Sequence, residues 1–504
     1  MGELYNKLED YVYSDAYPFH APGHKRNYYE NDFFSEMYKR DIKDVNGFEI
    51  VSSSDGVIND AMIRAARTFG ADETHFLVGG STVGILAAVS ATVKKGGTMA
   101  VMRCAHRALY NAASIRDIKL KFIYGEVDSI LGITLGITCE QVAEVVEKNP
   151  EIEAVFVTSP TYEGISSDID EIAEYLHEKH IPLIVDATHG AHFGFAEFLP
   201  ANACSLEADI VIHSLYKTLP APTQAALIHM SGSIVDQEKL RYYLSVYQTS
   251  MPLYLLLAGI DDCVTFLSDE SVSWKSFYEK REKLSQDLQD LEYLGLFEAF
   301  TKDRFDTPEI GKMLIYSKSK YLDGKQLYDK LRKEFGIQAE MCMPAYVLLS
   351  FSVCDSDEGY ERLQMALKKI DFELSEKDRL SKEMDTRDLG NLEFLFGVSS
   401  SGNDIGRVPV YPRPCDDDVE CSIAEALESE KESLSINMSV GRTSGVYISV
   451  YPSLQPIVLP GEKISKEAII LISYFVKHGF KVQGVTMDRV EVLRQKKKDG
   501  IEGA

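Results

Sequence analysis

The sequence predicts an α/β protein with a large domain built on a mostly parallel sheet, followed by a smaller α+β domain. Between about residues 55 and 235, short apolar runs alternate with helical stretches, a pattern typical of a parallel sheet covered on both faces. From about residue 295, the runs KMLIYS and YVLLSFSV indicate further strands among helices. A chain of 504 residues is also too long for one ordinary core.

The strands expected in the large domain are short, apolar and rich in β-branched residues. They cover residues 75–78, 99–102, 121–123, 154–157, 183–185 and 210–212. The helices expected between them show apolar residues at helical spacing. They cover residues 59–69, 82–93, 139–148 and 169–179.

The flanking regions differ from this pattern. We expect an irregular, aromatic-rich N-terminal segment over 1–45, a large domain over 46–290 that ends in mostly helical sequence, and a C-terminal α+β region over 291–504. This last region is expected to carry the elements that follow. They are helices over 324–335 and 359–374, a charged stretch over 375–386, a loop over 399–404, a helix after about 420, a final helix and a basic tail.

Composition excludes several classes of function. The net charge of −25 disfavours binding to nucleic acid and to an anionic membrane surface. No apolar run is long enough to span a membrane, and the acidic N-terminus does not resemble a signal peptide. Eight cysteines without a CxxC pair argue against a disulfide framework and a structural zinc site. We therefore expect a cytoplasmic protein.

A glycine-rich turn follows the first expected strand. Gly79 and Gly80 lead into Ser81 and Thr82, which open a helix. Free N–H groups at a helix start attract phosphate, and glycine allows a close approach of the backbone. The alternative is an ordinary Ser/Thr helix cap. The turn is neither a P-loop nor a GxGxxG motif.

Polar residues follow other strands at the same edge of the expected sheet. Asp186 ends one strand, and a buried carboxylate there requires a partner such as a protonated ring nitrogen. His106 follows the strand over 99–102, and Ser214 and Lys217 follow the strand over 210–212. His189 and His192 form an HxxH pair, but no third ligand is in sight, so no metal site is expected.

This set of residue types suits pyridoxal 5′-phosphate (PLP). The lysine would carry the cofactor as a Schiff base, the aspartate would protonate the pyridine nitrogen, and the glycine-serine turn would hold the phosphate. The hypothesis identifies Lys217 as a buried, reactive amine rather than a surface residue.

The sequence also resembles the Orn/Lys/Arg decarboxylases, which are fold-type-I PLP enzymes that act on basic amino acids. The matching segments follow the family's order along nearly the whole chain. They are FHAPGHK, FGADETHFLVGGSTVG, RCAHRAL, VTSPTYEGISSDI, VDATHGAHFGF, HSLYKTLPAPTQAALIH, QTSMPLYLLLAGID, GRTSG and LPGEKIS. The chain begins almost at FHAPGHK, so it resembles the short, arginine decarboxylase-like members that lack an N-terminal wing domain.

The resemblance implies a seven-stranded type of sheet and a role for each matching residue. Gly80, Ser81, Thr82 and Ser214 would hold the phosphate. His106 would stack on the pyridine ring, Asp186 would pair with its nitrogen, His189 would lie beside it, and Lys217 would bind it covalently.

The resemblance also implies roles outside this cluster and at least a homodimer. Thr249 and Ser250 would reach the cofactor region near the interface between subunits, and Glu462 would bind the distal cation of the substrate. The dimers could pair further. The chain departs from the family pattern where Tyr216 replaces the usual histidine before the lysine, and where YPSLQP replaces a YPPG-type motif.

These implications lead to one main hypothesis and two alternatives. The main hypothesis is decarboxylation of a basic L-amino acid, with arginine first, lysine second and ornithine third, in polyamine biosynthesis. One alternative is another PLP reaction, such as transamination or elimination, for which Arg442 could bind the α-carboxylate. The other is a non-catalytic paralogue that binds PLP or only dimerises.

Overall fold

The computed structural model describes residues 2–13, 32–42, 56–128, 130–269, 271–297, 309–388, 409, 411–451 and 455–495. The FHAPGHK motif, the expected loop over 399–404, the centre of YPSLQP and most of the basic tail lie outside these ranges.

A seven-stranded sheet forms the centre of the large domain, in the order β1-β7-β6-β5-β4-β2-β3. Strand β7 runs antiparallel to its neighbours β1 and β6, and the remaining pairs are parallel. The strands are β1 (Glu73–Leu77), β2 (Thr98–Met102), β3 (Lys119–Ile123), β4 (Ile152–Thr158), β5 (Leu183–Asp186), β6 (Ile210–Ser214) and β7 (Ala226–Met230). The mostly parallel sheet expected from the sequence is therefore confirmed.

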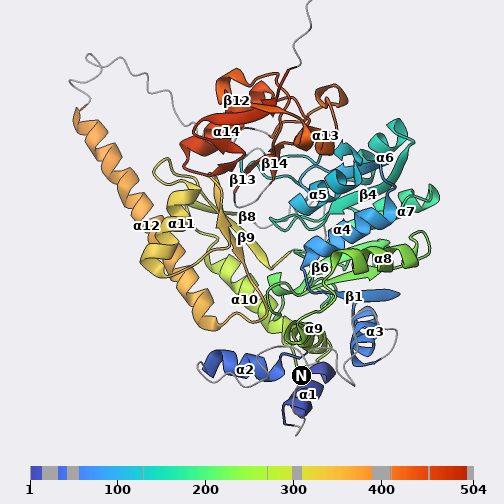
Figure 1. Ribbon diagram of the computed structural model, residues 1–504. Coiled ribbons are helices and arrows are strands. Elements are labelled where there is room, and N and C mark those ends of the chain that lie inside the picture. Colours follow the sequence, from blue (N-terminus) through green and yellow to red (C-terminus); the bar gives the residue numbers. More distant parts are fainter. Residues whose placement is uncertain are drawn as a thin grey trace, which may run out of the picture.

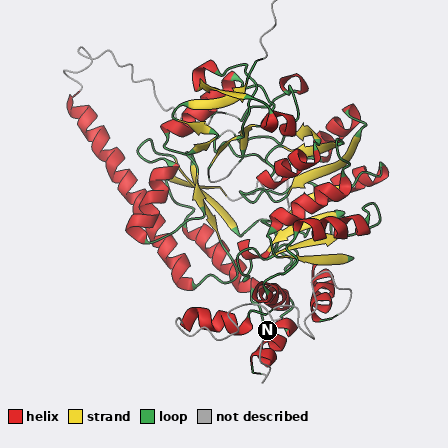
Figure 2. Cartoon of the chain, in the orientation of Figure 1, coloured by secondary structure: helices red, strands yellow, loops and turns green. Residues whose placement is uncertain are grey.

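Helices cover both faces of this sheet (Figure 2). Helices α4 (Ser81–Thr92), α5 (Arg107–Arg116) and α8 (Gln237–Tyr247) pack on one face. Helices α6 (Cys139–Lys148) and α7 (Ile169–Glu178) pack on the other. Helix α3 (Val57–Phe69) packs with α1 (Glu3–Val12) and α9 (Tyr254–Leu267) in a further apolar cluster, near the labelled N-terminus in Figure 1.

Successive side chains of these strands enter different cores, because strand residues alternate between the two faces. Ile184 packs in the core beside α4, whereas Val185 packs in the core beside α6 and α7. Ile212 likewise faces α4, and Val211 faces the opposite side. By the same alternation, Asp186 and Ser214 lie on the α4 face of the sheet.

The strand register brings the polar strand ends to one edge. Leu77 of β1 and Ser214 of β6 both pair with Ala226 of β7. Asp186 pairs with Ile212 on one side and with Thr158 on the other. The turn that follows Leu77 thus lies at the same edge and on the same face as Asp186 and Ser214, as the rule for parallel sheets predicts.

Helix α4 lies close to the sheet because one of its residues has no side chain. A Cβ atom on Gly84 would come within 2.7 Å of Leu77 Cδ1. The glycine therefore allows the N-terminus of α4 to sit directly above the strand ends.

The structure corrects several expected elements. Strand β7 was not among those expected, and the segment over 1–45 contains helices α1 and α2 (Asp32–Arg40) rather than only irregular chain. Helix α12 (Asp357–Asp388) continues through the charged stretch. Pairs such as Lys382–Asp378, spaced four residues apart, explain this continuation.

A four-stranded antiparallel sheet, β10-β11-β9-β8, forms the first part of the C-terminal region. Its strands are β8 (Leu294–Phe297), β9 (Lys312–Ser317), β10 (Met341–Cys342) and β11 (Tyr346–Ser350). Helices α10 (Trp274–Asp287), α11 (Gly324–Phe335) and α12 pack against it in one apolar core. Figure 1 shows α12 along the outer side of this part.

Two small three-stranded sheets form the remainder, in the orders β12-β17-β16 and β14-β13-β15. The strands are β12 (Lys431–Ser435), β13 (Ile448–Val450), β14 (Pro456–Val458), β15 (Val482–Gln483), β16 (Val485–Thr486) and β17 (Arg489–Leu493). Helices α13 (Ile423–Glu428) and α14 (Lys466–Lys477) accompany them. The chain therefore forms three more strands after its last helix, where only a basic tail was expected.

The domain boundaries near residues 45 and 290 stay a proposal, because the apolar clusters cross both of them. The N-terminal segment shares a cluster with the large domain, and the C-terminal region shares others with it. Within the described ranges, no helix combines the length and the apolar character needed to cross a bilayer.

Candidate active site

Lys217 lies one short turn beyond β6, in a 3-10 helix over Leu215–Lys217. Its Nζ atom is 3.0 Å from His189 Nε2 and donates to Thr188 Oγ1 at 3.3 Å. Burial lowers the pKa of Lys217 to about 8, with the cation of Lys312 adding to the effect and the carboxylates of Asp186 and Glu340 opposing it. The lysine is therefore a largely enclosed amine and not a surface residue.

Asp186 is buried at the carboxyl end of β5, with 1% of its surface exposed. Its Oδ1 atom accepts a hydrogen bond from the backbone N–H of Thr188 at 3.2 Å. It lies within electrostatic range of both Lys217 and His106. A carboxylate so enclosed needs a cation to offset its desolvation, and the site supplies Lys217 nearby.

The turn before α4 presents donors that the protein itself does not use. Gly80 is the N-cap of α4 with φ of +72°, and no side chain caps the helix. Ser81 and Thr82 are therefore free of the ordinary capping role that the sequence left open. The positive φ of Gly80 is one that residues with a side chain rarely adopt. The N–H of Val83 donates to the Gly80 carbonyl at 3.2 Å, so the N–H groups of Ser81 and Thr82 are the candidates for binding a ligand.

Further hydroxyl groups at this edge are buried without a partner. Within the described part of the chain, Ser214 Oγ, Thr218 Oγ1 and Thr158 Oγ1 are enclosed and accept or donate no hydrogen bond. Buried polar atoms are normally satisfied. Ser214 lies level with Leu77, which precedes the turn before α4, so its unused hydroxyl is consistent with an anion at this position.

His106 caps α5 at the neighbouring strand end. Its Nδ1 atom accepts a hydrogen bond from the backbone N–H of Ala108 at 3.2 Å. Desolvation by the groups around the ring lowers the pKa of His106. The carboxylate of Asp186 opposes this effect, and the cations of Lys217 and Arg107 add to it. A neutral ring in this position can stack on an aromatic cofactor.

The two histidines of the HxxH pair face different partners. His189 contacts Lys217, and burial, followed by the nearby cations of Lys217 and Lys312, lowers its pKa well below the usual range. His192 Nε2 lies 3.2 Å from Glu309 Oε1. The pair therefore does not converge on a common point as metal ligands would.

Sequence reasoning missed several residues that the structure adds to the site. The ring of Tyr162 packs edge-on against His189, with 4.6 Å between centroids, and its hydroxyl donates to Glu340 at 2.8 Å. Lys312 of β9 is buried with 2% exposure and donates to Ser350 Oγ at 2.8 Å. One indication of these residues was present in the sequence, namely that Lys312 opens the apolar strand KMLIYS.

The carboxylate of Glu462 is not available to bind a substrate. Its carboxylate forms a bidentate ion pair with Arg103, one contact measuring 2.8 Å, and accepts from the backbone N–H of Leu459 at 2.8 Å. Both side chains are buried. The predicted role in binding the distal cation is not supported, because Arg103 and Leu459 already occupy both oxygens.

Breaking this pair is expected to destabilise the protein. The Glu462→Gln change should cost about 3–5 kcal/mol, because it leaves the Arg103 cation buried without a counter-charge. Thermal unfolding of the holoenzyme measures the effect. The double change Arg103→Met with Glu462→Met should recover most of the loss. An unchanged melting temperature with a raised KM would restore the substrate role instead.

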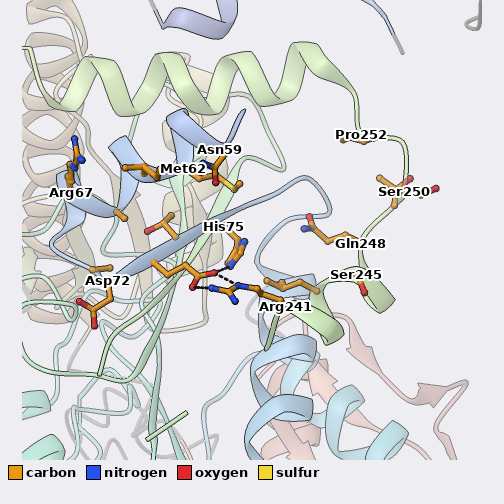
Figure 3. Close-up of a pocket in the computed structure, with 17 residues that line it drawn as sticks. Asn59, Met62, Arg67, Asp72, His75, Arg241, Ser245, Gln248, Ser250 and Pro252 are labelled. Atoms are coloured by element: carbon orange, nitrogen blue, oxygen red, sulfur yellow. Dashed lines mark hydrogen bonds and ion pairs between the residues drawn. The ribbon is translucent and has the colours of Figure 1, made fainter. Parts of the chain in front are cut away.

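Thr249 and Ser250 lie in the loop between α8 and α9 and form none of the described contacts with Lys217, His189 or Asp186. Both residues line a cavity of about 670 Å³ between α3, β1 and α8, beside the Glu73–Arg241 ion pair (Figure 3). The preceding residue, Gln248, accepts from the backbone N–H of Val78 at 3.1 Å. The loop is thus tied to the end of β1, and its predicted contact with a cofactor of a second subunit stays a prediction.

The side chain of Arg442 forms its hydrogen bonds within the C-terminal region. It donates to Glu432 Oε1 at 2.6 Å and to the backbone carbonyl of Leu493 at 2.8 Å. These contacts hold β12 and β17 together, and they leave no support for Arg442 as the carboxylate anchor of an aminotransferase.

The donor set fits PLP. The turn before α4 and the unused hydroxyl of Ser214 suit its phosphate, the neutral His106 suits its ring, Asp186 suits its ring nitrogen, and Lys217 offers an amine for its aldehyde. These residues come from four separate segments, which lie at the carboxyl ends of β1, β2, β5 and β6.

Comparisons with known proteins agree with this fit. Residues 3–358 match the family model described as "Orn/Lys/Arg decarboxylase, major domain". An arginine decarboxylase from Bacillus subtilis is 28% identical over 514 residues, covering 98% of both chains. An arginine decarboxylase from Halalkalibacterium halodurans is 27% identical over 485 residues, covering 94% of both chains.

Solved structures show the same fold. The constitutive lysine decarboxylase of Escherichia coli has a TM-score of 0.77 at 18% identity, covering 98% of this chain and 82% of that one. The lysine decarboxylase of Francisella novicida has a TM-score of 0.79 at 16% identity, covering 98% and 81%. With the family model matching well over half of the sequence, the chain belongs to the Orn/Lys/Arg decarboxylase family of PLP-dependent enzymes.

Proposed function

We propose that this enzyme decarboxylates a basic L-amino acid to the corresponding amine and carbon dioxide, with PLP held on Lys217. The observation that carries the proposal is the enclosed amine of Lys217, 3.0 Å from His189 and within electrostatic range of the buried Asp186. Burial lowers its pKa to about 8. An amine with such a pKa is neutral often enough near physiological pH to act as a nucleophile.

Each residue of the site has a role in this chemistry. PLP, when bound, supplies an electron sink for the bond between Cα and the carboxylate. Asp186 would keep a proton on the pyridine nitrogen, and His106 would support the ring by stacking. Ser81, Thr82 and Ser214 would hold the phosphate. Lys217 would hold the aldehyde carbon of the cofactor, and its amine, once released, would be available to deliver a proton to Cα of the substrate.

Arginine is the first choice of substrate, followed by lysine and ornithine. The support is that two relatives of nearly full coverage, at 27–28% identity, are named arginine decarboxylase. An amine formed from any of these substrates would enter polyamine biosynthesis. We further propose a cytoplasmic homodimer or a dimer of dimers in which Thr249 and Ser250 serve the site of a second subunit.

The test is an absorbance spectrum of the purified holoenzyme, followed by titration with L-arginine, L-lysine and L-ornithine while carbon dioxide is measured. We expect a visible band from PLP bound to Lys217, a shift of that band, and release of carbon dioxide with arginine at the highest kcat/KM. Formation of a keto acid without carbon dioxide would support an aminotransferase instead. A band that responds to none of the three would contradict the proposed function.

A further inference from the structure

An exposed carboxylate on the first part of the C-terminal region contacts Tyr162, a residue of the site. Glu340 lies between α11 and β10, and its backbone N–H donates to the carbonyl of Leu348 at 3.1 Å. Its side chain is exposed. One oxygen, Oε1, accepts the hydroxyl of Tyr162 at 2.8 Å.

We infer that Glu340, together with Tyr162 and Tyr216, forms the subsite that binds the distal cation of the substrate. The inference rests on the proposed function and assigns the residues that select a basic side chain. It replaces Glu462, whose two oxygens are taken by Arg103 and Leu459.

A short chain of contacts connects Glu340 to the reacting amine. The carboxylate holds the Tyr162 hydroxyl, the Tyr162 ring packs edge-on against His189, and His189 lies 3.0 Å from Lys217 Nζ. Glu340 also lies within electrostatic range of Lys217 and Tyr216. These contacts place the Glu340 carboxylate on the far side of Tyr162 and His189 from the amine of Lys217.

Other carboxylates near the site are already engaged. Glu163 accepts the hydroxyl of Tyr346 at 2.8 Å, and burial raises the pKa of Glu163, which favours its neutral form. Glu309 is buried against His192. Among the acidic residues described around Lys217 and Lys312, Glu340 combines an accessible carboxylate with an oxygen, Oε2, for which the structure shows no hydrogen bond.

The two tyrosines favour a flat cation over a compact one. Tyr216 directly precedes Lys217 and has 38% of its surface exposed, and burial together with Glu340 raises its pKa, which keeps it neutral. Aromatic faces bind cations, and a planar guanidinium both stacks on such faces and pairs with a carboxylate through two hydrogen bonds. Tyr216, which stands where the family usually has histidine, would offer such an aromatic face near Glu340 and so favour a guanidinium.

The experiment compares the holoenzyme with its Glu340→Gln variant, using L-arginine and its uncharged isostere L-citrulline as substrates. Glutamine keeps the acceptor for the Tyr162 hydroxyl and removes only the charge. The kcat/KM for L-arginine should fall about 10- to 100-fold, mainly through KM, because a charge-assisted pair is lost. The ratio of kcat/KM for L-arginine to that for L-citrulline should fall by a similar factor.

Two further variants complete the design. Tyr162→Phe should lower kcat/KM for L-arginine about 2- to 10-fold, because the exposed Glu340 carboxylate loses the hydroxyl hydrogen bond that orients it. Glu361→Gln, an exposed change on α12 of the same region, should leave kcat/KM unchanged.

The outcomes separate the inference from the proposed function. The inference is overturned if Glu340→Gln stays within twofold of the parent enzyme, or if its kcat/KM falls equally for both substrates. If the parent enzyme releases no carbon dioxide from any basic amino acid, the proposed function itself fails and the inference falls with it. The PLP absorbance band of Glu340→Gln should match that of the parent enzyme in every case, because the change does not touch the residues that hold the cofactor.

Discussion

Replacing Lys217 by alanine is expected to abolish decarboxylation while leaving the fold intact. The change removes the amine that we propose binds the cofactor covalently and supplies the proton to Cα. Loss of a group that acts in covalent catalysis typically lowers kcat by about 10³- to 10⁶-fold. The neighbouring Thr188 and His189 lose one contact each, a small change for a core of this size.

Two measurements check this prediction on the same sample. The visible band of bound PLP should disappear and not return on addition of PLP, and the release of carbon dioxide should fall to background. Circular dichroism and the melting temperature of the apoprotein should match those of the parent apoprotein. Lys179→Ala, at an exposed lysine after α7, is the matched control and should retain activity. Substantial activity in Lys217→Ala would refute the assignment of the lysine.

The second large effect is expected for Asp186→Asn. Asparagine has the same shape and still accepts the hydrogen bond from the N–H of Thr188, but it carries no charge. The pyridine nitrogen would then lose the anion that keeps it protonated, and the ring would become a weaker electron sink. A fall in kcat of about 10²- to 10⁴-fold is expected from the loss of a group with this electrostatic role.

The spectrum distinguishes a catalytic loss from a loss of cofactor. The PLP band should remain with Lys217 intact, although its position should change because the ring charge changes. Titration of the variant with PLP followed by steady-state assays gives kcat at full occupancy. Asp170→Asn, at an exposed position of α7, serves as the control. A variant with kcat within tenfold of the parent enzyme would show that Asp186 does not carry this role.

Local signals predicted much of the fold. Helices over 139–148 and 324–335 were predicted to the residue, because each begins at a capping box: Thr138 with Gln141, and Asp323 with Gln326. The glycine at 336 adopts φ of +64° and ends the second helix. Conversely, β7 was missed, because a short apolar run flanked by loop residues does not by itself distinguish a strand from connecting chain.

The central cluster of the site was also predictable, since the residues concerned lie at strand ends. The carboxyl ends of parallel strands meet at one edge regardless of the rest of the molecule. From the sequence alone, this rule predicts that Asp186, Ser214 and Lys217 lie close together. The strand register confirms this placement for Asp186 and Ser214.

The periphery of the site depended on contacts between distant parts of the chain. Arg103 pairs with Glu462 across 359 positions, and Tyr162 contacts Glu340 across 178. No periodicity or cap encodes such pairs, because they form only when the C-terminal region packs onto the large domain. The sequence by itself therefore determined the sheet and the polar edge at which Lys217 lies, through short-range rules. The tertiary structure alone decided which carboxylate is buried in an ion pair and which stands open at the site.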